Sequence, residues 1–165
     1  DPEPPYGIAV TKKGMTMRFS LRPHREPSTR AGRKYARVRD GDEIVEVSLV
    51  DESDKIACAT RDGRFLIAEA KEVPILSGPG LGVILIKVLQ DDAVLGAKVL
   101  HDQDDALVMQ KEGSPTKFEI STRKYEITSR AGRGRELFSR GALSGVVLSE
   151  PTLPGLPAPD GEAQS

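Results

Sequence analysis

The sequence predicts an all-β protein built as a propeller-like array of about three four-stranded blades. Three observations support this fold class. A segment of about 50 residues recurs three times along the chain. Short runs rich in Val, Ile, Leu and Phe are bounded by Gly, Asp and Pro, as strands are. No window keeps an apolar 3.6-residue period for ten residues, so no long helix is expected. Roughly four strands per repeat is typical of a propeller blade.

Each repeat is marked by a strand, a charged two-residue turn followed by glycine, and a second strand. The turn glycines are Gly14, Gly63 and Gly113, which stand 49 and 50 residues apart. A glycine-containing loop follows each turn by about 18 residues. The clearest further strand candidates are Lys55 to Thr60, Val83 to Val88 and Ala106 to Gln110.

The repeats divide the chain into units at about residues 11–60, 61–110 and 111–148 of one domain, residues 6–148. Residues 1–5 are interpreted as a linker, and residues 149–165 as a disordered acidic tail. The third unit lacks its last strand, and Tyr6 to Thr11 at the start of the chain matches that missing strand. The repeat units are therefore circularly shifted along the sequence. We therefore expect strand exchange, and a first strand without a partner unless the array closes or another blade precedes it. Closed propellers use more blades, which favours an open arc or part of a larger disc.

Composition sets limits on the class of protein. The single cysteine, Cys58, excludes an internal disulfide and is expected to be a buried structural thiol. No apolar run approaches a membrane span of about 18 residues, so no membrane association is expected. The sequence suits a cytoplasmic location. No metal site and no cofactor are predicted.

The order of strand, charged turn with glycine, strand, basic glycine-containing loop and Gly41-Asp42-Glu43-Ile44-Val45 resembles a known family. It resembles the C-terminal β-pinwheel domain found in the A subunits of bacterial type IIA topoisomerases, DNA gyrase or topoisomerase IV. The resemblance covers about residues 6–148. It implies four-stranded blades that exchange strands, and a basic outer rim around which double-stranded DNA passes.

The resemblance also implies the setting of the domain. It would be a non-catalytic accessory module of an ATP-dependent type II topoisomerase, associated with the nucleoid. Its partners would be duplex DNA, a dimer of A subunits, and the B subunit of the topoisomerase. Gyrase carries a Gln- and Arg/Gly-rich box in its first blade, and none occurs in this sequence. This difference favours a topoisomerase IV-like subunit or the later blades of a gyrase subunit.

Net charge tests the DNA interpretation. The whole chain carries −1, but the units differ: +3 for residues 11–60, −3 for 61–110 and +4 for 111–148. The acidic residues gather in two turns, at residues 51–54 and 101–105. Since equivalent repeat positions point the same way, we expect the basic loops on one rim and the acidic turns on another edge. The second unit offers only Lys71 and Lys87 to the rim.

Arginines among small residues suit phosphate, because a guanidinium binds phosphate oxygens bidentately. The predicted DNA-binding residues are Arg22, Arg25, Arg30, Arg33, Lys34, Arg37, Arg123, Lys124, Arg130, Arg133, Arg135 and Arg140. No recognition helix is evident and Asn is absent, so binding is expected to be independent of sequence. About eight phosphate contacts would give a slope near −7 in log K against log salt.

Two other classes of function compete with DNA binding. A β-repeat scaffold that binds proteins is the alternative, because the acidic edge and the second unit suit it. An enzyme is disfavoured, because the chain has two histidines, one cysteine and no convergent catalytic motif.

Overall fold

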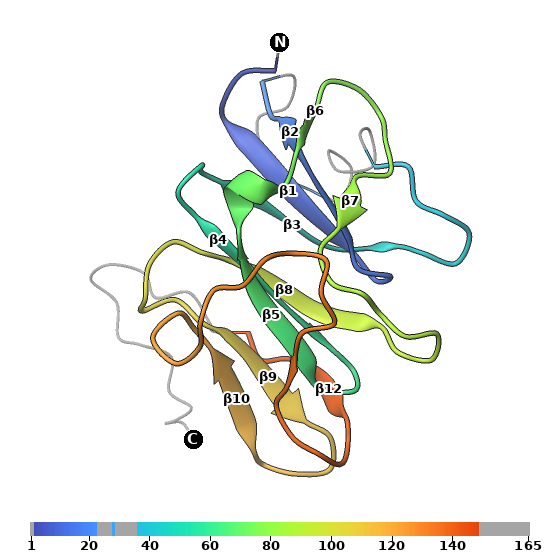
Figure 1. Ribbon diagram of the computed structural model, residues 1–165, viewed down its shortest axis with the longest axis vertical. Helices are drawn as coiled ribbons and strands as arrows, with labels where there is room; N and C mark the ends of the chain where they lie inside the picture. The colour runs from blue at the N-terminus through green and yellow to red at the C-terminus, as the bar shows by residue number, and fades with distance from the viewer. Residues whose placement is uncertain (1, 23–27, 29–35, 149–165) are drawn as a thin grey trace, which may run out of the picture.

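The computed structural model describes residues 2–22, 28 and 36–148 of the chain. In these residues the structure consists of strands and loops with one 3₁₀ turn, Ala70–Glu72, and no α-helix. Figure 1 shows three sheets along the long axis of the molecule, which we call blades one, two and three in chain order. The all-β fold class is confirmed. No helix of the described part could span a membrane, and the predicted tail lies outside the described residues.

Blade one is built on a hairpin of β1 (Tyr6–Thr11) and β2 (Met15–Ser20), with β3 (Ile44–Val50) on the other side of β1. Both pairings are antiparallel. The Thr11 hydroxyl accepts a hydrogen bond from the Met15 N–H at 3.0 Å and so fixes the turn. The expectation that Tyr6 to Thr11 lacks a partner is wrong, because β3 returns to its own blade and makes β1 a central strand.

The other two blades repeat this arrangement. Blade two contains β4 (Lys55–Thr60), β5 (Arg64–Glu69) and β8 (Val94–Leu100), and blade three contains β9 (Leu107–Lys111), β10 (Lys117–Ile120) and β12 (Leu143–Val146). In each blade the first strand pairs with the second and the third. The Thr60 hydroxyl accepts the Arg64 N–H at 3.2 Å, as Thr11 does in blade one.

The remaining strands are exchanged between units. The segments between the second and third strands, residues 70–93 and 121–142, we call exchange loops two and three. Loop two supplies β6 (Ile75–Leu76) and β7 (Val83–Ile84) to blade one, where both pair with β2. Loop three supplies β11 (Arg135–Glu136) to β5 of blade two. Strand exchange is thus confirmed, but its donor is the loop of the next unit. In the described residues, β10 has no such partner, so blade three has three strands.

Two glycines allow the exchanged loops to lie against the neighbouring strand. Gly82 and Gly134 have φ angles of +74° and +76°, which side chains disfavour. A Cβ atom at Gly82 would lie 2.3 Å from the Thr16 carbonyl oxygen, and one at Gly134 would lie 2.4 Å from that of Phe65. Glycine is therefore required where each loop meets the preceding blade.

Apolar cores lie between the blades. Between blades one and two, Ile8 and Val10 pack with Ile56, Cys58 and Leu66. Between blades two and three the core includes Ala57, Phe65, Ile67, Leu107, Met109 and Ile120. Burial on both faces explains why the central strands β1 and β4 are apolar without alternation. Cys58 is fully buried, as predicted, and burial raises the pKa of its thiol to about 12.

The run from Val83 to Val88 is only partly a strand. Val83 and Ile84 form β7, whereas Leu85 and Ile86 leave the sheet and are buried between units. The Leu85 N–H donates to the Gly14 carbonyl oxygen at 2.7 Å, and Ile86 forms a single bridge to Gly132 of loop three. The prediction of a full strand is wrong, because this run pairs with blade one at its start and contacts exchange loop three at its end.

Candidate nucleic-acid interface

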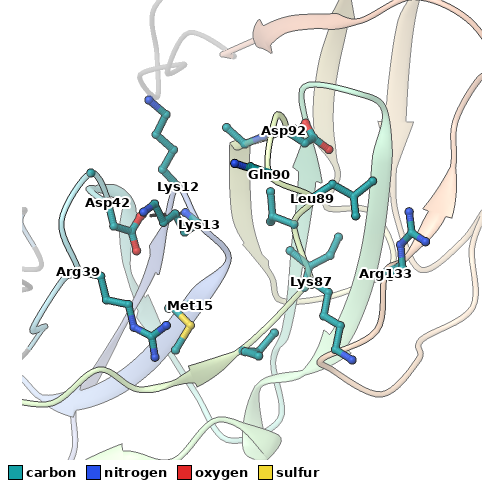
Figure 2. A pocket seen from close by; sticks show the side chains of 15 residues that line it. Lys12, Lys13, Met15, Arg39, Asp42, Lys87, Leu89, Gln90, Asp92 and Arg133 are labelled. Atoms are coloured by element: carbon teal, nitrogen blue, oxygen red, sulfur yellow. Dashed lines mark hydrogen bonds between the residues drawn. The ribbon is translucent and has the colours of Figure 1, made fainter.

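A groove of about 770 Å³ lies where blade one, exchange loop two and exchange loop three meet. Five basic residues and two acidic residues line it. The basic residues are Lys12, Lys13, Arg39, Lys87 and Arg133, and all five are exposed. Figure 2 shows Lys12, Lys13 and Arg39 on one side, and Lys87, Leu89 and Arg133 on the other. We call this the cationic groove.

Backbone hydrogen bonds hold the two sides of the cationic groove together. The Val94 N–H of blade two donates to the Lys12 carbonyl oxygen at 2.8 Å, while loop two is tied to the turn at Gly14. The Lys13 ammonium donates to the Asp40 carbonyl oxygen at 2.8 Å, which fixes the position of its charge. The spacing of the cations therefore depends on how the units pack.

The two acidic side chains of the groove accept hydrogen bonds from backbone N–H groups. One Asp42 carboxylate oxygen accepts the N–H groups of Lys13 and Glu43, at 2.8 and 2.9 Å. Asp92 repeats this one unit later, accepting the N–H groups of Asp62 and Ala93. These two carboxylates are fewer than the five exposed cations, so the groove has an excess of positive charge.

The chemistry of the cationic groove suits a polyanion. Its apolar lining includes Met15, Ile86 and the exposed Ile84 and Leu89, and no aromatic side chain is among the described lining residues. Stacking of unpaired bases uses aromatic side chains. Cations on two facing walls can instead contact phosphate oxygens along a nucleic-acid backbone.

Groups with a shifted pKa lie away from the cationic groove. Among the described residues these are Glu46, Cys58 and His101, and none lines the groove. No cluster of three potential metal ligands occurs in the described part of the chain. The groove thus offers charge rather than an acid–base pair.

Arg130 has a different environment from Arg133, although both were predicted to contact DNA. The guanidinium of Arg130 donates to the carbonyl oxygens of Glu72 at 3.1 Å and Ile84 at 3.0 Å. The Arg133 side chain is exposed and lines the groove. Arg130 therefore joins loop three to loop two, while Arg133 is available to a ligand.

Three further candidates pair with acidic residues. Arg22 forms an ion pair with Glu3 at 2.7 Å, and Lys124 with Glu119 at 3.6 Å. Arg123 hydrogen-bonds to Asp104, in one of the acidic turns. The expected separation of basic and acidic edges therefore does not hold at Arg123.

The two acidic turns do lie together, as predicted. His101 Nδ1 lies 2.9 Å from the Asp54 carboxylate, which joins the turn at 101–105 to that at 51–54. The hydrogen bond to the Asp54 carboxylate raises the pKa of His101, and burial opposes this shift. We call these two turns the acidic edge.

The remaining described candidates are exposed around the loops. The Arg135 guanidinium lies 5.7 Å from the Phe65 ring centre and 5.8 Å from that of Tyr125. Arg37 is tied through its backbone N–H to the Gly80 carbonyl oxygen at 2.8 Å, and Arg140 is exposed. Arg25, Arg30, Arg33 and Lys34 lie outside the described residues.

Lys12 and Lys13 were missed because the sequence marks them only as the charged turn of a hairpin. Lys87 was noted, but as an isolated residue of an acidic unit. Strand exchange brings these residues together, because it places loop two beside the turn of the preceding unit.

Comparison with known proteins agrees with this architecture. The family model described as "DNA gyrase C-terminal domain, beta-propeller" matches residues 8–51 and 54–101. Relatives include the A subunit of DNA topoisomerase 4 from Bacillus subtilis (strain 168), 26% identical over 129 residues, which are 78% of this chain and 16% of that protein. The A subunit of DNA gyrase from Helicobacter pylori (strain ATCC 700392 / 26695) is 30% identical over 125 residues, 75% of this chain and 15% of that protein.

Solved structures share the fold. The C-terminal domain of DNA topoisomerase IV superposes with a TM-score of 0.72 at 20% identity, over 91% of this chain and 48% of that structure. The DNA gyrase A C-terminal domain gives 0.69 at 17% identity, over 91% and 51%. The chain thus spans about half of these domains and about a sixth of the full-length relatives.

Proposed function

The chain belongs to the family of DNA gyrase C-terminal domains with a β-propeller fold, and on this premise we propose that it is a non-catalytic module that binds duplex DNA. The observation that carries the proposal is the cationic groove, with five exposed cations from two units and from a third unit's loop. Phosphate contacts of this kind supply affinity without reading bases.

The cationic groove, rather than all twelve predicted residues equally, is the proposed centre of the interface. Arg37, Arg135 and Arg140 would extend it along the exposed loops. Arg22, Arg123 and Lys124 would contribute less, because each already contacts a carboxylate. Exposed ion pairs are worth only about 0–1 kcal/mol, so they open at little cost. These three side chains would therefore still add to the positive potential around the groove.

In its longer protein the module would serve a type II topoisomerase. It would be part of an A subunit that dimerises and works with a B subunit in an ATP-dependent reaction on cytoplasmic, nucleoid DNA. The supporting observation is that the relatives matched over most of this chain are named as A subunits of DNA gyrase and topoisomerase 4. The module itself would bind DNA next to the domains that carry out the reaction.

Titration of a fluorescent duplex of random sequence tests the proposal. We expect binding at about 50 mM salt and a slope of log K against log salt of at least about 4.5 in magnitude, because the five groove contacts alone would give that value. Affinity should be the same for duplexes of different sequence. Absence of binding at low salt would refute DNA as the ligand.

The acidic edge supports a second candidate, a scaffold that binds a basic protein surface. Its exposed carboxylates include Asp51, Asp102 and Asp104. Neutralising these residues should leave DNA affinity intact or increase it, whereas it would abolish binding to a basic partner.

A further inference from the structure

Exchange loop two places an exposed leucine inside the cationic groove. Leu89 is 53% exposed, and Figure 2 shows it on the wall that also carries Lys87 and Arg133. Its neighbour Val88 packs against the core between blades one and two, so the loop buries one apolar side chain and leaves the next one open. A single exposed leucine is common on protein surfaces and by itself indicates nothing. Leu89 differs because cations surround it and because its backbone is fixed.

Hydrogen bonds fix the turn that carries Leu89. The Asp92 N–H donates to the Leu89 carbonyl oxygen at 2.9 Å, and the Asp92 carboxylate accepts the N–H of Asp62 at 2.9 Å. Two residues before Leu89, the Lys87 N–H donates to the Gly132 carbonyl oxygen at 2.8 Å. Because this backbone is ordered before a ligand arrives, Leu89 can press into a ligand with little further loss of conformational entropy.

The first unit carries a cation at the repeat position of Leu89. Its turn is closed by the same hydrogen bond, which the Asp42 N–H donates to the Arg39 carbonyl oxygen at 2.9 Å. Arg39 therefore corresponds to Leu89, and both side chains line the cationic groove. Arginine at this position suits phosphate, whereas leucine can gain only from contact with an apolar surface.

The base stack is the main apolar surface that a duplex offers between its phosphates. Leucine is one of the side chains that insert between base steps from the minor groove of a duplex, where they partly unstack the bases and kink the helix. Unstacking has a cost, which phosphate contacts close to the inserted side chain must offset. The five cations of the cationic groove are placed to make those contacts.

We propose that Leu89 enters the minor groove of the bound duplex and unstacks one base step. This role rests on the proposed function, because it requires duplex DNA in the cationic groove. Pyrimidine–purine steps such as TA unstack most easily, and they recur throughout ordinary sequences. Duplexes of mixed sequence are therefore bound alike, while Leu89 sets where the bound duplex kinks.

An adenine analogue whose fluorescence is quenched by stacking tests the proposal. It is placed at the single TA step of an otherwise stiff duplex of about 20 base pairs, with dyes at both ends for energy transfer. With the 165-residue chain at concentrations that saturate the duplex, we expect the fluorescence to rise about twofold or more. The ends should approach each other as for a kink of about 20° or more. Leu89→Ala should lose most of both signals and still bind.

Three further variants separate shape from charge. Leu89→Phe keeps an apolar wedge and should keep both signals. Leu89→Arg gives the second unit the residue of the first. It should abolish both signals and raise the magnitude of the slope of log K against log salt by about 0.9, for one more phosphate contact. Leu81→Ala removes an exposed leucine of the same loop from outside the cationic groove and should change neither signal.

The wedge and the proposed function fail in different ways. Fluorescence and energy transfer that are unchanged in Leu89→Ala, while the duplex stays bound, would overturn the role of Leu89 and leave DNA binding in place. Absence of binding by the wild-type chain would overturn both. Loss of both signals in Leu89→Ala and Leu89→Arg, with retention in Leu89→Phe and Leu81→Ala, supports the wedge.

Discussion

The guanidinium of Arg130 donates a hydrogen bond to the backbone carbonyl oxygen of Ile84 at 3.0 Å, and so ties exchange loop three to β7. Three residues later, Arg133 lines the cationic groove on the side opposite Lys12 and Lys13 (Figure 2). Two arginines three residues apart in one loop therefore differ: Arg130 holds the units together, and Arg133 is open to a ligand.

Replacing Arg130 by Ala should lower the free energy of unfolding by about 1–3 kcal/mol, because two carbonyl oxygens lose a charged donor. Replacing Arg133 by Ala should change it by less than about 0.5 kcal/mol, as expected for an exposed side chain. Urea unfolding measures both. Equal stability of the two variants would contradict the role assigned to Arg130.

Gly134→Ala should destabilise the protein by more than about 2 kcal/mol. The new methyl group would meet the Phe65 carbonyl oxygen in addition to being strained at positive φ. Gly113→Ala is the matched control, because Gly113 has φ +70° but no atom within 4 Å of an added Cβ. It should cost only about 1 kcal/mol. A similar loss of stability in both variants would show that φ alone, and not the close approach, decides.

The contact between His101 and Asp54 predicts a pH dependence. Since the pKa of His101 is raised by the hydrogen bond to Asp54, the folded state binds the proton more tightly than the unfolded state. The stabilisation is fully present below the unfolded pKa of about 6.5 and is lost as pH rises through the higher folded value. Exposure of the His101 side chain limits the effect to less than about 1 kcal/mol.

Melting temperatures between pH 5.5 and 8.5 check this sign. The wild-type protein should lose more stability over this range than His101→Gln, which keeps a polar side chain but has no titrating ring. Curves that stay parallel would show that the contact does not favour the protonated imidazole.

Much of the fold follows from the sequence, because the repeat is local. The charged turns, their glycines and the flanking apolar runs fix the hairpins, and Lys55 to Thr60 is β4 as predicted. The partner of Tyr6 to Thr11 could not be obtained in this way. Its pairing depends on whether β3 returns to its own blade, and the strand patterns are the same in either case.

The site was less accessible to sequence analysis than the fold. Arginine suits phosphate and backbone carbonyl groups equally well, so the sequence did not separate Arg130 from Arg133. The cationic groove joins Lys12 to Lys87 and Arg133, which are far apart in the chain. Only the packing of loops from different units brings these charges together.

The salt dependence of duplex DNA binding by two variants with equal net charge tests the central claim most directly. The groove variant carries Lys12→Gln, Lys13→Gln, Lys87→Gln and Arg133→Gln. The control variant carries Lys55→Gln, Lys98→Gln, Lys111→Gln and Lys117→Gln, which lie outside the lining of the cationic groove and outside the predicted DNA-binding residues. The groove variant should lose about 3.6 from the magnitude of the log K against log salt slope, at about 0.9 per phosphate contact, while the control variant keeps the wild-type slope. Equal losses in the two variants would contradict the cationic groove as the DNA-binding site.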